Sequence, residues 1–174
     1  MTDPSNQPPG PPADGPAAFP PQEISAFLRF CAGEWMALRS RFALAEAAVV
    51  AEGDEWHSSE RGELVVAYLE PGGAECPVDS PGGLSVGPKG EPARRLLFAA
   101  NGNFQVGEQR GSWQLWPDGS LELVMASNGS ELRERIWFTK PNLRLRSTVE
   151  NHADGSPGRA SFSSEIRRVS RPAS

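Results

Sequence analysis

The sequence is short of the residues that most often bind metals or act as nucleophiles. Its 174 residues include two histidines, His57 and His152, and two cysteines, Cys31 and Cys76. The histidines lie far apart in sequence, and neither they nor the cysteines have the spacing of a zinc site. A glycine-rich phosphate-binding loop is also missing. The sequence therefore predicts no metal site and no nucleotide-binding loop.

Long apolar runs and an excess of positive charge are missing as well. No apolar stretch approaches the roughly 20 residues that a membrane-spanning helix needs. The first basic residue is Arg29, so no charged segment precedes an apolar stretch as in a signal peptide. The net charge of −5 argues against nucleic acid or an anionic membrane as the main partner. We therefore expect a cytoplasmic protein whose cysteines are reduced thiols.

Composition divides the chain into a tail and one domain. The first 21 residues contain eight prolines and almost nothing that a core could bury, which predicts a disordered tail over residues 1–21. Residues 22–170 have the length and apolar content of a single domain. A short C-terminal tail over residues 171–174 completes the predicted organisation.

A short helix is expected at the start of the domain. In the segment QEISAFLRFCAG, Ile24, Phe27, Leu28 and Cys31 fall at helical spacing. The next motif, Gly33-Glu34-Trp35, resembles the Gly-x-Trp start of lipocalin-like barrels. The two features together favour a lipocalin-like fold that begins with a short helix.

Turn signals dominate the rest of the chain. Extended segments alternate with four turn pairs, Asn101-Gly102, Asp118-Gly119, Asn128-Gly129 and Asp154-Gly155. Pairs of this kind are the strongest short-range signal for β-hairpins. They predict an antiparallel meander of about eight strands, with a long loop from Pro71 to Pro92 that contains one short strand. Such a meander closes into a barrel or packs as a sandwich, and a closed eight-strand barrel can hold one small ligand.

One predicted strand, in the segment FTKPNLRLRST, carries two arginines on the same face. Alternate residues of a strand share a face, so Arg144 and Arg146 point the same way. The pattern alone favours a solvated outer face, with Leu143 and Leu145 turned to the core. The alternative is a clamp for a ligand with two negative groups.

The C-terminal third carries the most specific motifs. The segment ERIWFTKPNLRLRST, followed after a turn by ASFSSEIRR, closely resembles the S-type phycobiliprotein lyases, also called the CpcS/CpeS chromophore lyases. The segment GEWMALRSRF resembles the opening of the same family, with Trp35 four residues before Arg39. The resemblance runs from Gln22 to Val169 and is thin between Glu52 and Pro92.

This resemblance implies an all-β fold, a lipocalin-like antiparallel β-barrel with a short N-terminal helix. It implies a lyase of cyanobacterial photosynthesis and the phycobilisome that attaches an open-chain tetrapyrrole, phycocyanobilin or phycoerythrobilin, through a thioether bond. The acceptor would be a cysteine of an apo-phycobiliprotein α or β subunit, and the bilin is a substrate rather than a permanently bound cofactor. Because the reacting thiol belongs to the acceptor, Cys31 and Cys76 are interpreted as structural.

Two alternatives to an autonomous lyase stay open on the sequence. One is a non-catalytic carrier of bilin or lipid on the same barrel. The other is an accessory subunit of a paired lyase. For the oligomeric state, we expect a homodimer or a heterodimer with a related lyase.

The resemblance also implies the site residues. Glu165 would be catalytic, because it could pair with protonated pyrrole nitrogens or donate a proton to the bilin. Trp113 and Trp116 could stack on pyrrole rings, although they fit ordinary core or rim packing equally well. The implied bilin-binding residues are Arg39, Arg144, Arg146, Trp113, Trp116 and Thr148.

Overall fold

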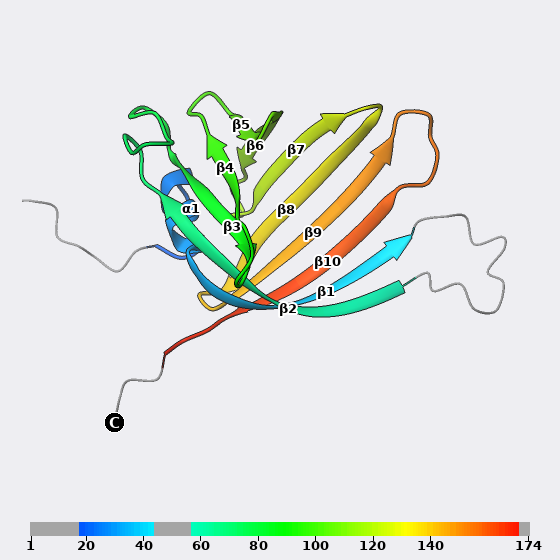
Figure 1. The fold of residues 1–174 in the computed structure, drawn as a ribbon, viewed down its shortest axis with the longest axis horizontal. Helices are drawn as coiled ribbons and strands as arrows, with labels where there is room; N and C mark the ends of the chain where they lie inside the picture. Colours follow the sequence, from blue (N-terminus) through cyan, green and yellow to red (C-terminus); the bar gives the residue numbers. More distant parts are fainter. Residues whose placement is uncertain (1–17, 44–56, 171–174) are drawn as a thin grey trace, which may run out of the picture.

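The computed structural model describes residues 18–43 and 57–170. Most of the predicted tail over residues 1–21, and all of the predicted tail over residues 171–174, lie outside the described residues. The described part forms one short helix and a ten-strand closed barrel (Figure 1). None of its helices is long and apolar enough to cross a membrane.

The elements follow one another in a simple order. They are α1 (Ile24–Cys31), β1 (Gly33–Ala43), β2 (His57–Leu69), β3 (Gly82–Pro88), β4 (Arg94–Phe98), β5 (Asn103–Val106), β6 (Gln109–Leu115), β7 (Leu121–Ser127), β8 (Ser130–Lys140), β9 (Leu143–His152) and β10 (Arg159–Arg167). Each strand pairs antiparallel with its neighbours in the chain, and β1 pairs with β10 to close the barrel. This architecture confirms the predicted lipocalin-like antiparallel barrel with a short N-terminal helix.

The turn pairs lie where the sequence predicts them, each in the connection between two paired strands. Asn128 and Gly129, between β7 and β8, have φ angles of 48° and 79°, the left-handed conformation that a type I′ hairpin turn requires. The predicted count of about eight strands is too low. The strand missed by the sequence pattern is β5, because its four residues lie between two turns and are too short for a visible alternation.

Helix α1 packs against one end of the barrel through its apolar face. Phe27, Leu28 and Cys31 are buried, as the helical spacing predicts. Burial of Phe27 and Leu28 contributes about 1.5–3 kcal/mol each. In Figure 1, α1 lies at the end of the barrel opposite the β7–β8 and β9–β10 hairpins.

The barrel contacts the chain a few residues before the helix. The rings of Phe19 and Phe30 lie 5.9 Å apart, and Pro20 lies directly against Gly119 in the β6–β7 turn. Pro21 is buried. Residues 19–21, which their composition assigns to the tail, therefore pack on the barrel.

Candidate functional site

The two arginines of β9 point into the barrel. Arg144 is 1% exposed and Arg146 is 9% exposed, whereas Leu143 and Leu145 are half-buried on the other face of the strand. Leu145 pairs across the outer face with Trp137 of β8 and Ser164 of β10. The interpretation of the arginines as a solvated outer face is therefore wrong. It fails because strand alternation cannot tell which face a closed sheet turns inward.

The neighbouring strand β10 supplies the carboxylate that makes the buried arginines possible. Glu165 of β10 is fully buried and pairs in register with Arg144. The Nε atom of Arg144 donates to the Oε2 atom of Glu165 over 2.5 Å. Removal of either partner of such a buried ion pair would leave an uncompensated charge in the interior, which is strongly destabilising.

Arg146 is held more loosely than Arg144. Its Nη1 atom lies 3.4 Å from a Glu134 oxygen, and its Nε atom lies 3.4 Å from the second oxygen of Glu165. The Nε contact is close enough for an ion pair but is not aligned as a hydrogen bond, so this N–H stays unsatisfied. The Nη2 atom of Arg144 is also buried without an acceptor. Two guanidinium groups thus keep unused donors inside the barrel.

The cluster is electrically balanced. Arg144 and Arg146 contribute two positive charges, and Glu134 and Glu165 contribute two negative ones. Burial alone would lower the pKa of Arg146, but the Glu134 and Glu165 carboxylates outweigh burial, so its pKa is raised. Arg146 therefore remains a cation that can accept a carboxylate ligand.

Glu134 of β8 is a site residue that the sequence reasoning missed. It accepts from Arg146 and also from the Thr148 hydroxyl over 3.4 Å, and its side chain is 21% exposed. Thr148, a predicted ligand-binding residue, pairs in register with Glu134. The available signal was strand alternation, because Glu134 lies two residues before the buried Ile136 and so shares its face.

Arg39 of β1 lies on the same row as Arg146. Arg39 pairs with Ser163 of β10, and Ser163 pairs with Arg146 of β9. Alternation from the buried Trp35 puts Arg39 on the inner face, where it is half-buried. Within the described part of the chain, Arg39 has no carboxylate partner. It is therefore the predicted arginine with the most freedom to bind an anion.

The two predicted tryptophans occupy different places. Trp113 faces inward from β6, donates from Nε1 to the Ala99 carbonyl over 2.8 Å, and lies 6.4 Å from the Phe98 ring. Trp116 lies in the β6–β7 turn, with the Arg135 guanidinium 5.7 Å from its ring centroid. Arg135 is on the outer face of β8, next in sequence to the inward Ile136. The structure thus brings Trp113 to the inner wall and leaves Trp116 with outer-face residues; stacking on a bilin stays a prediction for both.

A small cavity connects the charged cluster to the apolar interior. Its volume is about 30 Å³, and it is lined by apolar side chains of β3, β4, β7 and β8 together with Cys31, Arg94, Glu134, Arg144 and Arg146. Burial raises the pKa of the Cys31 thiol, and the nearby Arg144 offsets only part of this effect. Both Cys31 and Cys76 are free. The Cys31 thiol is therefore protonated and a poor nucleophile.

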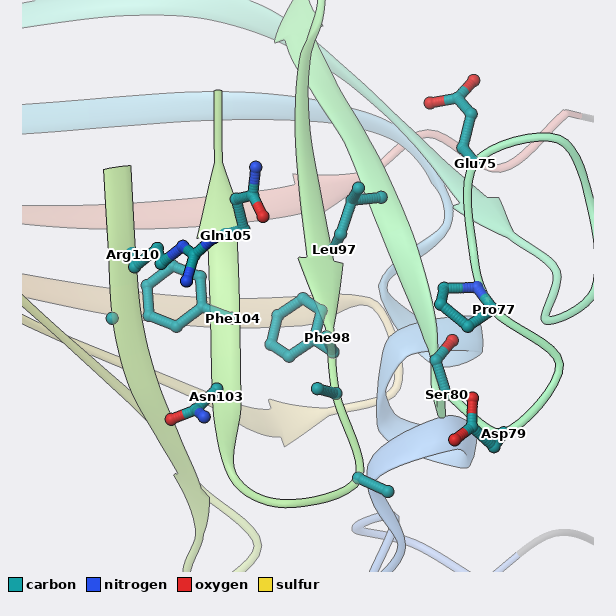
Figure 2. A pocket seen from close by; sticks show the side chains of 13 residues that line it. Glu75, Pro77, Asp79, Ser80, Leu97, Phe98, Asn103, Phe104, Gln105 and Arg110 are labelled. Carbon is teal, nitrogen blue, oxygen red and sulfur yellow. The ribbon is translucent and has the colours of Figure 1, made fainter. Parts of the chain in front are cut away.

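A larger hollow lies away from the charged side chains of this cluster. Its volume is about 570 Å³, and it is lined by residues of β4–β6 and of the loop that precedes β3 (Figure 2). Pro77 and Asp79 stand on the loop side, opposite Gln105 and Arg110. None of the predicted site residues lines it, so size alone does not identify the site.

Comparison with known proteins agrees with the motifs. Residues 90–168 match the model of the family described as CpeS-like protein. The chain is 44% identical over 157 residues to Chromophore lyase CpcS/CpeS 1 of Paulinella chromatophora, covering 88% of this chain and 92% of that protein. It is 40% identical over 80 residues to Chromophore lyase CpcS/CpeS 2 of Synechococcus sp. (strain JA-3-3Ab), covering 45% of this chain and 42% of that protein.

The fold has a solved counterpart. The S-type phycobiliprotein lyase CPES from Guillardia theta superposes with a TM-score of 0.66 and 19% identity, over 85% of this chain and 94% of that chain. At that identity the match concerns the fold alone. The Paulinella relative, by contrast, is similar along nearly its full length. On this similarity and these motifs, the chain belongs to the CpcS/CpeS family of chromophore lyases.

Proposed function

We propose that this protein binds an open-chain bilin and attaches it to a cysteine of an apo-phycobiliprotein subunit through a thioether bond. The observation that carries the proposal is the pair of buried guanidinium groups with unused donors inside a closed barrel, at Arg144 and Arg146. A bilin carries two propionate carboxylates, and a guanidinium group binds a carboxylate in a bidentate fashion better than an ammonium group does.

The contacts favour binding of the two propionates by Arg146 and Arg39, rather than by a clamp of Arg144 and Arg146. Arg144 is already committed to Glu165 at 2.5 Å, whereas the contacts of Arg146 are all long. A propionate can therefore displace Glu134 from Arg146 at little cost. Arg39, on the same row and without a carboxylate partner, is suited to the second propionate.

The chromophore itself would lie toward the end of the barrel away from α1. The cavity of about 30 Å³ beside the cluster has room for water but not for a tetrapyrrole. Along β9, Arg146 and Thr148 are progressively farther than Arg144 from the α1 end. A bilin whose propionates reach Arg146 and Arg39 would extend from this row toward the β7–β8 and β9–β10 hairpins.

The covalent step needs no nucleophile from this protein. The acceptor thiolate adds to the ethylidene group of the terminal pyrrole ring, a C–S bond forms as the C=C bond becomes single, and a proton is delivered to the bilin. No oxidant or reductant is consumed. The barrel would contribute a fixed chromophore conformation and exclusion of water, and Glu165 would hold or return the proton once Arg146 turns to the propionate.

An exposed apolar face supports pairing with a second copy of this chain. Met36 and Leu38 of β1 and Phe162 and Ile166 of β10 are 41–55% exposed and lie on adjacent strands. A hollow of about 440 Å³ beside them is also lined by Arg61 and Glu63 of β2, so charges of both signs border the face and could pair across a two-fold axis. A heterodimer with a related lyase is the other outcome that sedimentation of the purified chain, alone and mixed, would reveal.

The test of the proposal is co-expression of this chain with a bilin source and candidate apo-phycobiliprotein α and β subunits in the bacterial cytoplasm, where its free thiols stay reduced. We expect bilin fluorescence to remain on one subunit in a denaturing gel, and to be lost when this chain is omitted. Bilin binding by the purified chain without any covalent product would instead indicate a carrier. Activity only with a second lyase present would indicate an accessory subunit.

A further inference from the structure

A buried indole ring with two guanidinium groups lies next to the charged cluster. Trp35 of β1 is 1% exposed. The Cζ atoms of Arg144 and Arg167 lie 4.4 Å and 4.3 Å from its ring centroid. The face of an indole ring attracts cations, and the attraction is stronger where water is excluded. We refer to Arg144, Trp35 and Arg167 as the arginine–tryptophan stack.

One end of the stack is anchored on helix α1. Arg167 donates to the carbonyls of Phe30 and Ala32, and the Nε1 atom of Trp35 donates to the Cys31 carbonyl over 3.0 Å. The last carbonyls of a helix have no partner within the helix and favour a positive charge. Arg167 and Trp35 therefore hold the C-terminal end of α1 against the barrel.

The other end of the stack reaches the charged cluster. Arg144 meets the Trp35 ring with its guanidinium group and meets Glu165 with its Nε atom, while its Nη2 atom has no acceptor. The ring and the carboxylate thus fix both the plane and one edge of this guanidinium. Burial, and then the nearby charge of Arg144, lower the pKa of Arg167, so the stack brings two like charges together at a cost. The ring and the helix carbonyls offset that cost.

We infer that Trp35 and Arg167 are positioning residues for bilin binding. They hold Arg144 on Glu165, and Glu165 in turn contacts Arg146, the residue proposed to bind a propionate. Neither Trp35 nor Arg167 is among the residues lining the cavity beside the cluster. The inference rests on the proposed function. It means that Trp35 and Arg167, at the α1 end of the barrel, strengthen bilin binding without touching the bilin.

The first test compares Trp35→Phe with Trp35→Leu in the full chain. Both substitutions remove the indole N–H and reduce the side-chain volume, but only phenylalanine keeps an aromatic face for the guanidinium groups. We expect Trp35→Leu to bind phycocyanobilin about two- to tenfold more weakly than Trp35→Phe does, the range for one cation–π contact. The bound chromophore of Trp35→Leu should also show a shifted visible absorption band.

The second test compares Arg167→Lys with Arg168→Lys. Both keep the charge, and Arg168 is an exposed neighbour that forms ion pairs with Glu34 and Glu63. Lysine at position 167 can still donate to a helix carbonyl but has no planar group to stack on Trp35. We expect weaker bilin binding for Arg167→Lys and no change for Arg168→Lys, with both variants folded.

A measurement without bilin tests the positioning of Arg144 separately from the proposed function. The Arg144 Nε–H signal in a ¹⁵N spectrum, assigned by its loss in Arg144→Lys, reports hydrogen exchange at the Glu165 contact. We expect slow exchange in the parent and in Trp35→Phe, and faster exchange in Trp35→Leu and Arg167→Lys. Equal exchange in all four proteins would overturn the positioning role, as would equal bilin affinity of Trp35→Phe and Trp35→Leu. If the parent binds no bilin, the proposed function and the inferred ligand role both fail, and the exchange data still decide whether the stack holds Arg144.

Discussion

The two halves of the barrel interior differ in chemistry, although both follow the same strand alternation. The inner wall formed by β3–β7 is largely apolar: Arg94 on it is exposed, whereas its buried residues are Leu84, Val86, Phe98, Phe104, Leu121 and Leu123. The inner wall formed by β9, β10 and β1 carries Arg144, Arg146, Glu165 and Arg39. The apolar wall stabilises the fold through area removed from water, whereas the charged wall is tolerable only where each charge meets a partner. The comparison separates charges that hold the barrel together from charges left for a ligand.

The largest effect on stability is expected at the ion pair between Arg144 and Glu165. Replacing Arg144 by glutamine leaves Glu165 buried without its closest cation, and we expect a loss of about 3–5 kcal/mol in the free energy of unfolding. Denaturant unfolding measures this loss. The double variant Arg144→Met with Glu165→Leu should recover much of it, because neither charge then remains buried.

The apolar wall provides the control for that experiment. Phe104→Ala should cost a similar amount, about 3–5 kcal/mol, through the cavity that it leaves. Adding Glu165→Leu to Phe104→Ala should not restore stability, since Phe104 is not the partner of the Glu165 carboxylate. If Arg144→Gln unfolds like the parent protein, the pair is not structural and the distinction between the two walls fails.

A smaller but more specific effect is expected at Arg146. Arg146→Gln removes charge-assisted hydrogen bonds worth roughly 1.5–3 kcal/mol, so bilin affinity should fall by at least about tenfold. Fluorescence or absorption titration with free bilin measures the change. Esterifying both propionates should weaken binding to the parent and add little to the loss in Arg146→Gln, as expected when two changes remove one interaction. Equal affinity of parent and variant would place the propionates elsewhere.

Bilin affinity should depend less on Arg39 than on Arg146, because Arg39 is only half-buried. We expect Arg39→Gln to lower bilin affinity by about two- to tenfold, the value of one net hydrogen bond of about 0.5–1.5 kcal/mol. Arg133→Gln is the matched control, since Arg133 is exposed on the outer face of β8 and already pairs with Glu122 and Glu131. The assignment of the second propionate to Arg39 is wrong if both variants titrate alike.

The smallest effect concerns the N-terminal segment. Removal of residues 1–17 should leave the melting temperature unchanged, because these residues contain almost no apolar side chain to bury. Removal of residues 1–21 also deletes Phe19 and Pro20, which contact Phe30 and Gly119. We expect it to cost roughly 1 kcal/mol, or about 2–4 °C in a thermal melt. Identical melting of the two truncated proteins would show that the contacts contribute nothing.

Local patterns were sufficient for most of the fold. The spacing of Phe27, Leu28 and Cys31 determined both the existence and the buried face of α1. The four turn pairs determined where the hairpins reverse, because glycine or asparagine is needed where φ is positive. The four-residue β5 was missed, since so short a segment carries no measurable period.

The interior of the barrel was decided only by tertiary structure. Along β9, arginine and leucine alternate with period two, and that pattern is the same whichever face turns inward. Pairing of β10 with β9 brings Glu165 beside Arg144, and closure of β1 on β10 brings Arg39 onto the row of Arg146. A buried guanidinium is stable only against a buried carboxylate, and no local window of the sequence contains both partners. The sequence alone therefore determined the strands and the family, while the pairing of strands decided which arginine holds the barrel together and which remain available to a ligand.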